Sequence, residues 1–571
     1  CHGRRFRPWG KMELAAQASP RSEDAVTDHL PPAAPTAPTP PSPVRSLAPF
    51  GVPVFRVLWI AGLVSNIGSW MQTVGAQWLL VDSHSSPAVI ALVQTASAAP
   101  VLLLAIPAGV IGELLDRRRI LIVSQVAQFA VVTVLVVLTW LGETTPAVLL
   151  IVTFILGACA AVQLPSYQAI IPDVVPSRMI PAAASLSSVG VNIARAIGPA
   201  VAGLVVAQLG VTAVFIANAV SFGFFLVVLL LWRGYRPPPS RPEPFLDATR
   251  AGLRYVRHAG IVRRYYARLL LFLLPANALW ALLPVLASGR FGLDAGGYGL
   301  MLGALGAGSI VGALILPSLR RRAGAGGTIM IAFLLYGVAC VALPLIPSIW
   351  AALVALILAG MGWIGVLATF NGTVQAFLPP WVRTRGLSVY QLVLFGGTAA
   401  GAALAGLLGG MVGSVVVVVV AGACVIALGL VQLVWRLPST EGIGRAIVTA
   451  DGVHDRDGAS IDPDSPVVVV IRYVIPDDAL PEFLATMAQL RESRRRTGAR
   501  MWRLLQDPLS PGSYSETYSF GTWREHDSQV RARTTEYDEQ LSARARALSA
   551  APVVVAHYLV ADVPSGTRRA D

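Results

Sequence analysis

Long apolar segments, separated by short polar stretches, fill the chain from about residue 55 to about residue 435. Each segment is close to the ~20 residues with which an α-helix crosses ~30 Å of hydrocarbon. One set of six covers residues 55–80, 88–112, 120–141, 147–170, 183–206 and 212–232. A second set of six covers residues 267–288, 298–318, 328–346, 350–372, 387–409 and 413–435. The pattern predicts an all-α membrane protein with twelve transmembrane helices in two six-helix halves.

The polar stretches set the expected domain boundaries. We expect a disordered cytoplasmic tail at 1–50, a six-helix half at 51–233, a cytoplasmic linker with an amphipathic helix at 234–266, a second half at 267–436, a linker at 437–464, a small cytoplasmic α+β ferredoxin-like domain at 465–562 and a tail at 563–571. The first tail is rich in proline and has neither the apolar residues for a core nor those of a signal peptide. The apolar members of the amphipathic helix are Leu253, Val256, Ile261 and Tyr265.

The two sets of apolar segments repeat one another. The stretch Gln168–Pro172 matches Gln375–Pro379 at an offset of 207 residues (375 minus 168), and Arg178 matches Arg385 at the same offset. Two equivalent bundles around a central site are a transporter architecture.

Composition and charge support the membrane assignment. Hydrophobic residues make up 55% of the chain and charged residues only 13%, against about 25% charged residues in soluble domains. The net charge of +13 could indicate nucleic acid. However, the arginines fall mostly in short loops between apolar segments, where membrane orientation explains them. We therefore expect a lipid bilayer as partner, and no nucleic acid.

The loop charges predict the orientation. One set of loops holds Arg117–Arg119, Arg178, the stretch 233–264, Arg320–Arg322, Arg383 and Arg385. The alternate loops hold Asp82, Glu143, Arg290 and Asp294. Because Lys and Arg concentrate on the cytoplasmic side, both termini are expected in the cytoplasm of a multi-pass protein of a bacterial inner membrane.

No cofactor or metal is expected. The four cysteines, Cys1, Cys159, Cys340 and Cys424, show no metal-site or disulfide spacing. The chain also lacks the glycine-rich loop with lysine that binds nucleotide phosphates. Since the sequence begins with Cys1, we expect either a natural start at Met12 or a fragment.

One buried cation is the sharpest candidate for a substrate site. Arg195 lies near the middle of the fifth apolar segment, where a charged side chain costs roughly 2.5–3.5 kcal/mol and normally faces the bundle interior. A cation in a cavity would suit a carboxylate or catecholate, so we hypothesise a substrate with negative charge or strong acceptors. The alternative is a structural arginine held by backbone carbonyls and Asn192.

Other polar side chains share faces of the predicted helices. The first segment carries Asn66, Trp70, Thr73 and Gln77 at spacings of four, three and four, which place them on one helical face. Such a stripe must face protein or water rather than lipid. It either lines a translocation path or forms interhelical hydrogen bonds. Similar candidates for the cavity are Gln163, Tyr167, Asn371 and Gln375.

Several motifs carry a family resemblance. They are Phe55–Trp59, Asn66–Gln72, Pro107–Gly109, Gly112–Arg119, Gln168–Pro172, Asn192–Pro199, Asn371–Gln375 and Trp381–Arg383. Over residues 52–436 the chain resembles the major facilitator superfamily, in its enterobactin-exporter-like and multidrug-exporter-like branch. The resemblance implies proton-coupled export by alternating access, with gating residues at the loops after the second and eighth segments and an exporter signature in the fifth. The residues concerned are Gly109, Gly112, Glu113, Asp116, Arg117, Arg118, Gly198, Pro199, Arg320 and Arg321.

The chain departs from the family pattern in three places. No glycine follows Arg117 in the first loop, the loop with Arg320 has no acidic residue, and Ala202 replaces a glycine of the fifth segment. We therefore expect any charge lock in the first half. Glu113 either takes part in coupling or caps its helix and pairs with the neighbouring arginines. No Asp, Glu or His lies inside a predicted span, which gives protons no evident carrier.

The last hundred residues show the patterns of short strands and helices instead of long apolar segments. Strands are predicted at 467–475, 501–505, 514–520 and 553–560, and helices at 480–490 and 524–548. This βαββαβ order is ferredoxin-like. With Trp523, Glu525 and His526, the domain resembles the dimeric α+β barrels of antibiotic-biosynthesis monooxygenases, which implies a homodimer. An enzyme reading rests on His526 or Trp502 alone, so we expect no enzyme.

The sequence thus predicts a secondary active transporter that exports a siderophore-like or drug-like small molecule, with protons as coupling ion. The alternative is a transport-inactive sensor or assembly protein that signals through its α+β domain.

Overall fold

The computed structural model describes residues 47–232, 254–438, 444, 446–448 and 461–561, without the side chains of residues 105–114, 380 and 384. Most of the first predicted tail, all of the last and most of both predicted linkers lie outside these residues, whereas residues 47–50, expected in the disordered tail, are described.

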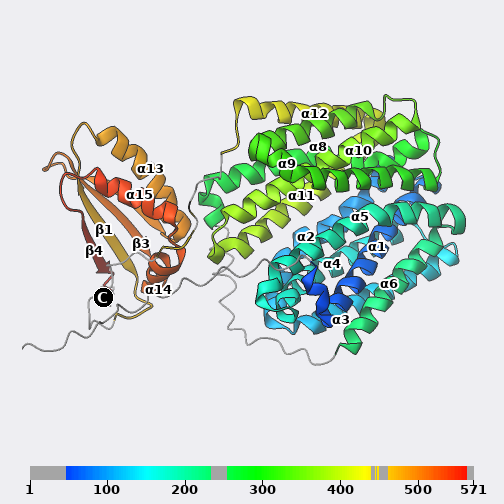
Figure 1. The fold of residues 1–571 in the computed structure, drawn as a ribbon, viewed down its shortest axis with the longest axis horizontal. Coiled ribbons are helices and arrows are strands. Elements are labelled where there is room, and N and C mark those ends of the chain that lie inside the picture. The colour runs from blue at the N-terminus through cyan, green and yellow to red at the C-terminus, as the bar shows by residue number, and fades with distance from the viewer. Residues whose placement is uncertain (1–46, 233–253, 439–443, 445, 449–460, 562–571) are drawn as a thin grey trace, which may run out of the picture. The chain divides into compact units, whose positions relative to one another are not determined.

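Eleven helices in the described part of the chain are long and apolar enough to cross a membrane. They are α1 (Pro53–Asp82), α2 (Pro87–Leu114), α3 (Arg117–Trp140), α4 (Pro146–Val174), α5 (Ile180–Leu209), α6 (Val211–Leu231), α8 (Gly260–Gly289), α9 (Ala295–Ala342), α10 (Ile349–Phe377), α11 (Pro380–Val412) and α12 (Ser414–Val434). Short 3-10 turns, η1 (Ala48–Gly51) and η2 (Ser177–Met179), precede α1 and α5. Figure 1 shows α1–α6 and α8–α12 as two bundles.

Helix α9 explains why eleven helices match twelve predicted segments. Its 48 residues would extend about 72 Å, more than twice the ~30 Å of a hydrocarbon core. At Gly324 the backbone leaves the helical region, with φ 65° and ψ 179°, a conformation that glycine tolerates. The residues before and after this kink are the predicted segments 298–318 and 328–346. The prediction of twelve apolar segments is therefore confirmed, since ten helices hold one segment each and α9 holds two.

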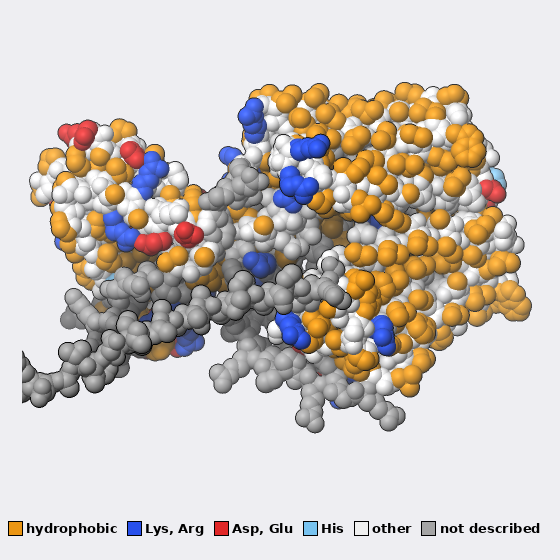
Figure 2. All heavy atoms as spheres, in the orientation of Figure 1, with side chains coloured by type: hydrophobic (Ala, Val, Ile, Leu, Met, Phe, Trp, Pro, Cys, Tyr) orange, Lys and Arg blue, Asp and Glu red, His pale blue; other side chains and the backbone are white. Residues whose placement is uncertain are grey.

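The helical domain has its apolar side chains outside as well as inside. Large apolar residues such as Val123, Leu314 and Val434 are exposed, the last by 92%. Polar residues such as Gln125 and Asn218 are fully buried. Figure 2 shows hydrophobic side chains over the visible sides of the bundles and charged side chains mainly towards the helix ends. This distribution suits helices surrounded by lipid.

Helix α8 forms the centre of the second half. Phe272 stacks on Phe333 with ring centroids 4.8 Å apart, and the Tyr336 hydroxyl donates to the Ala276 carbonyl at 2.6 Å. The helix begins at Gly260, so residues 260–266, expected in the linker, form its first turns.

The C-terminal domain has the predicted βαββαβ order. Its elements are β1 (Val467–Val474), α13 (Leu480–Thr497), β2 (Met501–Gln506), β3 (Ser513–Phe520), α14 (Trp523–Ser528), the π-helical turn η3 (Gln529–Arg533), α15 (Glu536–Ala547) and β4 (Val554–Leu559). The strands form an antiparallel sheet in the order β2-β3-β1-β4. The ferredoxin-like prediction is confirmed.

The single helix predicted at 524–548 is wrong. The chain forms α14 and η3, breaks at Thr534, and starts α15 after Thr535. Thr535 and Asp538 form a capping box, in which the Thr535 backbone N–H donates to Asp538 Oδ2 at 3.0 Å and the Thr535 hydroxyl accepts from the Asp538 backbone N–H. This box starts a separate helix because it satisfies backbone N–H groups that a continuous helix would have bonded to the preceding turn.

Two buried carboxylates join the elements of this domain: Glu516 joins α13 to the sheet, and Asp538 joins α13 to α15. Glu516 accepts from the Trp502 indole at 2.9 Å, from the Tyr473 hydroxyl at 3.1 Å and from Arg494 Nε at 3.2 Å. Asp538 on α15 accepts from Arg496 and Ser493 on α13.

Charge and hydrogen bonds both act on Asp538. Burial raises the pKa of its carboxyl, but Arg496 and the hydrogen bonds from Ser493 and Thr535 outweigh burial and hold the pKa below 3.8. The pair therefore stabilises the domain above that pH, and its contribution is lost as the pH falls through the folded-state pKa.

We expect Asp538→Ala to lower the free energy of unfolding of the C-terminal domain by about 3–5 kcal/mol, because it leaves the buried Arg496 unpaired. Tryptophan fluorescence during denaturant unfolding of the full chain measures this. Glu539→Ala is the control, since Glu539 pairs with Arg546 at a partly exposed position and should cost under about 1 kcal/mol. Equal losses in the two variants would contradict the assignment.

Candidate functional site

The two halves meet through small residues. The main contacts between them are made by α2 with α11, α5 with α9, α2 with α8, and α1 with α8. Between α5 and α9 the backbones nearly touch, because a Cβ placed on Gly203 would lie 2.5 Å from the Cα of Gly299. A Cβ on Gly306 would lie equally close to Ala196 Cα. Small residues therefore permit the close approach of helices that lipid alone would not drive together.

The second pair of helices shows the same packing. A Cβ on Gly406 of α11 would lie 2.4 Å from the Cβ of Ala91 in α2. Farther along, the Thr95 hydroxyl donates to the Ala399 carbonyl at 3.1 Å. These contacts run from the middle of the helices to the ends remote from the arginine clusters. The halves are therefore closed against each other at this end, which we call the small-residue end.

A pocket lies between the halves beside these contacts. Its lining side chains come from α1, α2, α8 and α9. They are Trp70, Thr73, Val74, Gln77, Gln94, Trp280, Tyr298 and Leu302. Both halves contribute, so relative movement of the halves must change the shape of this pocket. We call it the central pocket.

Two buried N–H groups belong to side chains that line the central pocket. Gln77 is 1% exposed and accepts a hydrogen bond from the Tyr298 hydroxyl at 2.7 Å. Among the described residues, neither its Nε2 nor the indole Nε1 of Trp280, which is 7% exposed, has a hydrogen-bond partner. Buried donors without acceptors are uncommon and costly. The pocket thus offers two N–H groups to an incoming acceptor.

Arg195 contacts Trp70, which lines this pocket. The guanidinium carbon lies 5.6 Å from the centroid of the Trp70 ring, within the range of a cation–π contact. Gly198, one turn along α5, makes room for Trp70, because a Cβ on Gly198 would lie 2.7 Å from that of Trp70. Trp70 in turn lies 6.1 Å from Trp280 of the other half. Among the described residues, no carboxylate lies within ion-pair distance of Arg195.

The other predicted cavity residues are held elsewhere. Asn66 and Asn192 donate to carbonyls of their own helices, at Gly62 and Ser188. Gln375 donates to Asn371 on the same helix at 3.1 Å. These bonds lie within single helices rather than between helices, and the predicted cavity roles of the four residues stay predictions.

Two residues of α4 pack within the first half. The amide of Gln125 in α3 donates to Gln163 Oε1 at 3.1 Å. Tyr167 packs edge-on against Phe225 and donates to the Leu58 carbonyl. Only Trp70, Thr73 and Gln77 of the predicted cavity residues line the central pocket, with Arg195 joined through Trp70.

Arg117 and Arg118, the first two residues of α3, contact α4 and α6, and the charge lock expected in the first half stays a prediction. Arg117 donates to Asp173 Oδ2 at 2.8 Å and to the Ala169 carbonyl at 3.0 Å, both on α4. Arg118 donates to the carbonyls of Leu229 and Leu230 at the end of α6. The first residues of α3 thereby tie this helix to α4 and α6.

The remaining gating candidates have simpler roles or are not described. Asp116 caps α3 by accepting from the Arg119 amide. In α9, Arg321 donates to Ser318, and Arg320 lies beside Gly372 of α10. Pro199 lies in α5, where its carbonyl oxygen approaches Gly299. The side chains of Gly109, Gly112 and Glu113 fall outside the described residues, so their predicted roles stay predictions.

The sequence identified some residues of the pocket and of the Arg117 ion pair, but not the residues that they contact. It did not identify Gln94, Trp280 or Tyr298 in the pocket, or Asp173 in the ion pair. The polar or aromatic character of the first three inside apolar segments was a usable signal. Which of them face the same space depends on the packing of the two halves.

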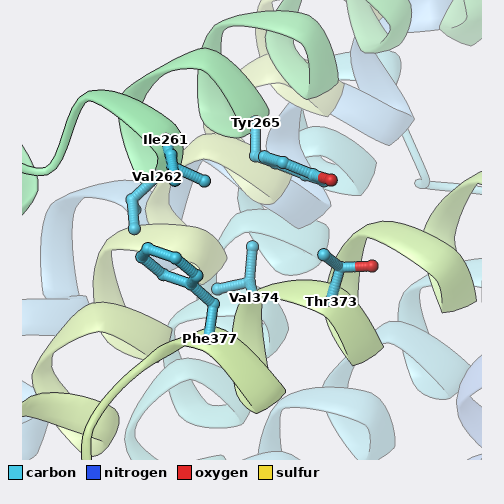
Figure 3. Close-up of a pocket in the computed structure, with 6 residues that line it drawn as sticks. All are labelled: Ile261, Val262, Tyr265, Thr373, Val374 and Phe377. Carbon is cyan, nitrogen blue, oxygen red and sulfur yellow. The ribbon is translucent and has the colours of Figure 1, made fainter. Parts of the chain in front are cut away.

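A second cavity lies inside the second half. Figure 3 shows it between α8 and α10, lined by Ile261, Val262, Tyr265, Thr373, Val374 and Phe377. It leaves about 160 Å³ of atom-free space and is almost wholly apolar. Because one half supplies all of its lining, it lacks the shared position of the central pocket.

Comparison with known proteins identifies the family. Residues 44–565 match the family described as transmembrane secretion effector, of the major facilitator superfamily. The chain belongs to this family. It is therefore a secondary transporter in a membrane rather than an enzyme, as the sequence predicted.

Relatives and solved structures agree with the family. The chain is 28% identical over 279 residues to the staphyloferrin A transporter of Staphylococcus aureus (strain NCTC 8325 / PS 47), covering 48% of this chain and 69% of the relative. It is 25% identical over 409 residues to the multidrug efflux pump Tap of Mycobacterium tuberculosis (strain ATCC 25618 / H37Rv), covering 69% and 95%. The crystal structure of the nucleoside transporter NupG shares the fold, with a TM-score of 0.54 at 14% identity, covering 68% and 100%.

We expect Gly299→Leu to hold the small-residue end apart, because the new side chain would collide with the backbone of α5. In a cysteine-free background, a Thr73→Cys reporter in the central pocket should then react faster with a membrane-impermeant thiol reagent added from that side. Gly410→Leu is the matched control, because a Cβ on Gly410 meets nothing within 4 Å. Unchanged reactivity in Gly299→Leu would contradict the closing role of this contact.

Proposed function

We propose that the chain exports a small molecule from the cytoplasm by alternating access across a bacterial inner membrane. The observation that carries this proposal is the central pocket, which both halves line and which the small-residue end closes on one side. Rocking of the halves would open this end while the arginine-rich ends come together. The relatives named for staphyloferrin A and for multidrug efflux support a siderophore-like or drug-like substrate.

The arginines support the orientation. Arg117–Arg119, Arg320–Arg322 and Arg178 lie at the helix ends opposite the small-residue end. Under the positive-inside rule this end faces the cytoplasm, with both termini. The state described by the structure is then closed towards the outside, so substrate would enter the central pocket from the cytoplasm.

We propose protons as the coupling ion, because the family resemblance implies proton-coupled export. Asp173 is the best-placed carboxylate, since its pair with Arg117 joins α4 to the loop before α3. Loss of this ion pair would free α4 from α3 at the arginine-rich end, which is a change that alternating access requires.

The C-terminal domain would join two copies of the chain. Helices α13 and α15 pack on one face of the sheet, while the strand residues of alternate parity point to the other. Apolar members of this open face are Val468, Val470, Val474, Met501, Leu505, Val554 and Tyr558. A second copy would bury this apolar face, and large exposed patches of this kind mark interfaces.

We expect Arg195→Ala to lower export at least tenfold with normal expression, because the pocket loses its cation. Efflux from cells with and without the chain, over a panel of siderophore-like and drug-like compounds, measures this. Arg264→Ala is the control, because Arg264 is an exposed arginine near the start of α8. Full activity of Arg195→Ala would remove Arg195 from the substrate path. Absence of transport of every compound by the wild-type chain would favour the transport-inactive sensor.

We expect Tyr558→Asp to convert a dimer to a monomer, because the charge would enter the interface. Tyr558 lies on edge strand β4 and is 51% exposed. Sedimentation of the detergent-solubilised full chain measures the change. Leu484→Asp is the control, since it adds the same charge at an exposed position of α13. A wild-type chain that stays monomeric at high concentration would contradict dimerisation.

A further inference from the structure

We infer that the ends of α8 and α12 on the arginine-rich side bind the phosphate headgroup of one anionic phospholipid. The site consists of Arg268 of α8, Gln432 of α12, and Trp435 and Arg436, which follow α12. We call it the lipid site. None of its residues lines the central pocket, so the inference goes beyond the export proposal.

Arg268 is a buried cation without an anion. Its side chain is 3% exposed, and a guanidinium stays charged in proteins. Its Nη2 donates to the backbone carbonyl of Trp435, which is a neutral acceptor. Among the described residues, no carboxylate pairs with Arg268, and its Nη1 has no hydrogen-bond partner. Because a buried charge without a counter-ion is costly, this position favours an incoming anion.

A second unused donor belongs to the same region. Gln432 is 5% exposed, and its Oε1 accepts from the Leu437 amide at 3.3 Å. Its Nε2 has no partner in the described part of the chain. The Tyr265 hydroxyl donates to the Pro438 carbonyl at 3.2 Å. Residues 435–438 are thus held between α8 and α12, and both unused donors belong to side chains that bind this short segment.

The site lies where headgroups and lipid chains meet. Helices α8 and α12 lie side by side (Figure 1). Val434, the last residue of α12, is 92% exposed, and Leu271, three residues after Arg268, is 42% exposed, as expected of side chains that face lipid. Arg436 is exposed just beyond. Under the orientation proposed above, these ends lie at the inner leaflet, whose anionic headgroups attract arginines.

An anionic phospholipid fits this site better than a free anion does. A guanidinium binds phosphate oxygens through parallel N–H···O bonds, and the Nε2 of Gln432 adds another donor. The acyl chains of the same molecule would cover exposed apolar side chains such as Val434 and Leu271, which a free phosphate cannot do. A zwitterionic lipid would bring its own cation towards Arg436.

Trp435 covers the site in the structure. The centroid of its ring lies 4.6 Å from the guanidinium carbon of Arg268, within the range of a cation–π contact, while the residue is 46% exposed. Indole side chains favour the boundary between lipid and water. Rotation of Trp435 towards this boundary would uncover Arg268, so that the lipid phosphate replaces the ring as the partner of the cation.

Native mass spectrometry of the detergent-solubilised full chain tests the site with three probes. They are phosphatidylglycerol, phosphatidylcholine with the same acyl chains, and inorganic phosphate. We expect one phosphatidylglycerol to bind about tenfold or more tightly than phosphatidylcholine, as a charge-assisted contact implies, and inorganic phosphate not to displace it. Equal affinity for the two lipids would overturn the inference. Displacement by inorganic phosphate would show a free-anion site and would overturn the lipid class.

Arg268→Met removes the cation and keeps a long apolar side chain. We expect it to weaken phosphatidylglycerol binding by about 10- to 100-fold, as for a lost hydrogen bond to a charged group. Arg322→Met is the matched control, because Arg322 is an exposed arginine at the arginine-rich end of the same half. It should change the affinity by less than about threefold. Equal effects of the two variants would overturn the inference.

Trp435→Ala tests the cover without removing a buried group. We expect it to bind phosphatidylglycerol about threefold or more tightly than the wild type, because the ring no longer competes for Arg268. An unchanged or lower affinity would contradict the replacement of the ring by phosphate. Unfolding temperatures establish that the variants are folded. If Arg268→Met does not fold, Trp435→Ala still decides, since Trp435 is half exposed.

Failure of this inference can be told apart from failure of the export proposal. A chain that exports compounds in cells but binds phosphatidylglycerol and phosphatidylcholine equally retains the proposed function and loses the lipid site. A chain that binds phosphatidylglycerol through Arg268 but exports nothing retains the lipid site and loses the export function.

Discussion

Hydrocarbon offers no hydrogen-bond partner to backbone or side chain, and this constraint shapes the whole helical domain. Each crossing must be a helix, and each polar side chain must find a partner or a cavity inside the protein. Gln125 and Asn218 are accordingly fully buried while Val434 is exposed. A site for a polar substrate can then exist only where helices enclose it, and the central pocket between the halves is such a place.

The pocket and its closure depend on the same helices. Helix α5 supplies Arg195 and Gly198 beside Trp70, and two turns later presents Gly203 to Gly299. A movement that separates α5 from α9 would therefore also shift the cation and its tryptophan. Binding at the pocket and opening of the small-residue end are linked in this way, because a ligand can shift an equilibrium only through contacts that differ between the two states.

Sequence patterns gave the helices, the two halves and the βαββαβ domain, because apolar periodicity and strand alternation are local properties. The same patterns identified Trp70, Thr73, Gln77 and Arg195. They could not show that Trp280 and Tyr298 complete the pocket, since this depends on how the halves pack. The break before α15 could have been predicted from the sequence, because Thr535 and Asp538 have the spacing of a capping box. The charged residues on both sides of this boundary suggested one continuous helix instead.

Distances between spin labels across the two halves test the central claim most directly. One pair, at Ser86 and Met411, spans the small-residue end, and a second pair, at Ser177 and Arg322, spans the arginine-rich end. In liposomes, with and without an imposed pH gradient, the account expects one distance to lengthen as the other shortens. Two distances that change together, or that stay fixed while transport proceeds, would contradict alternating access around the central pocket.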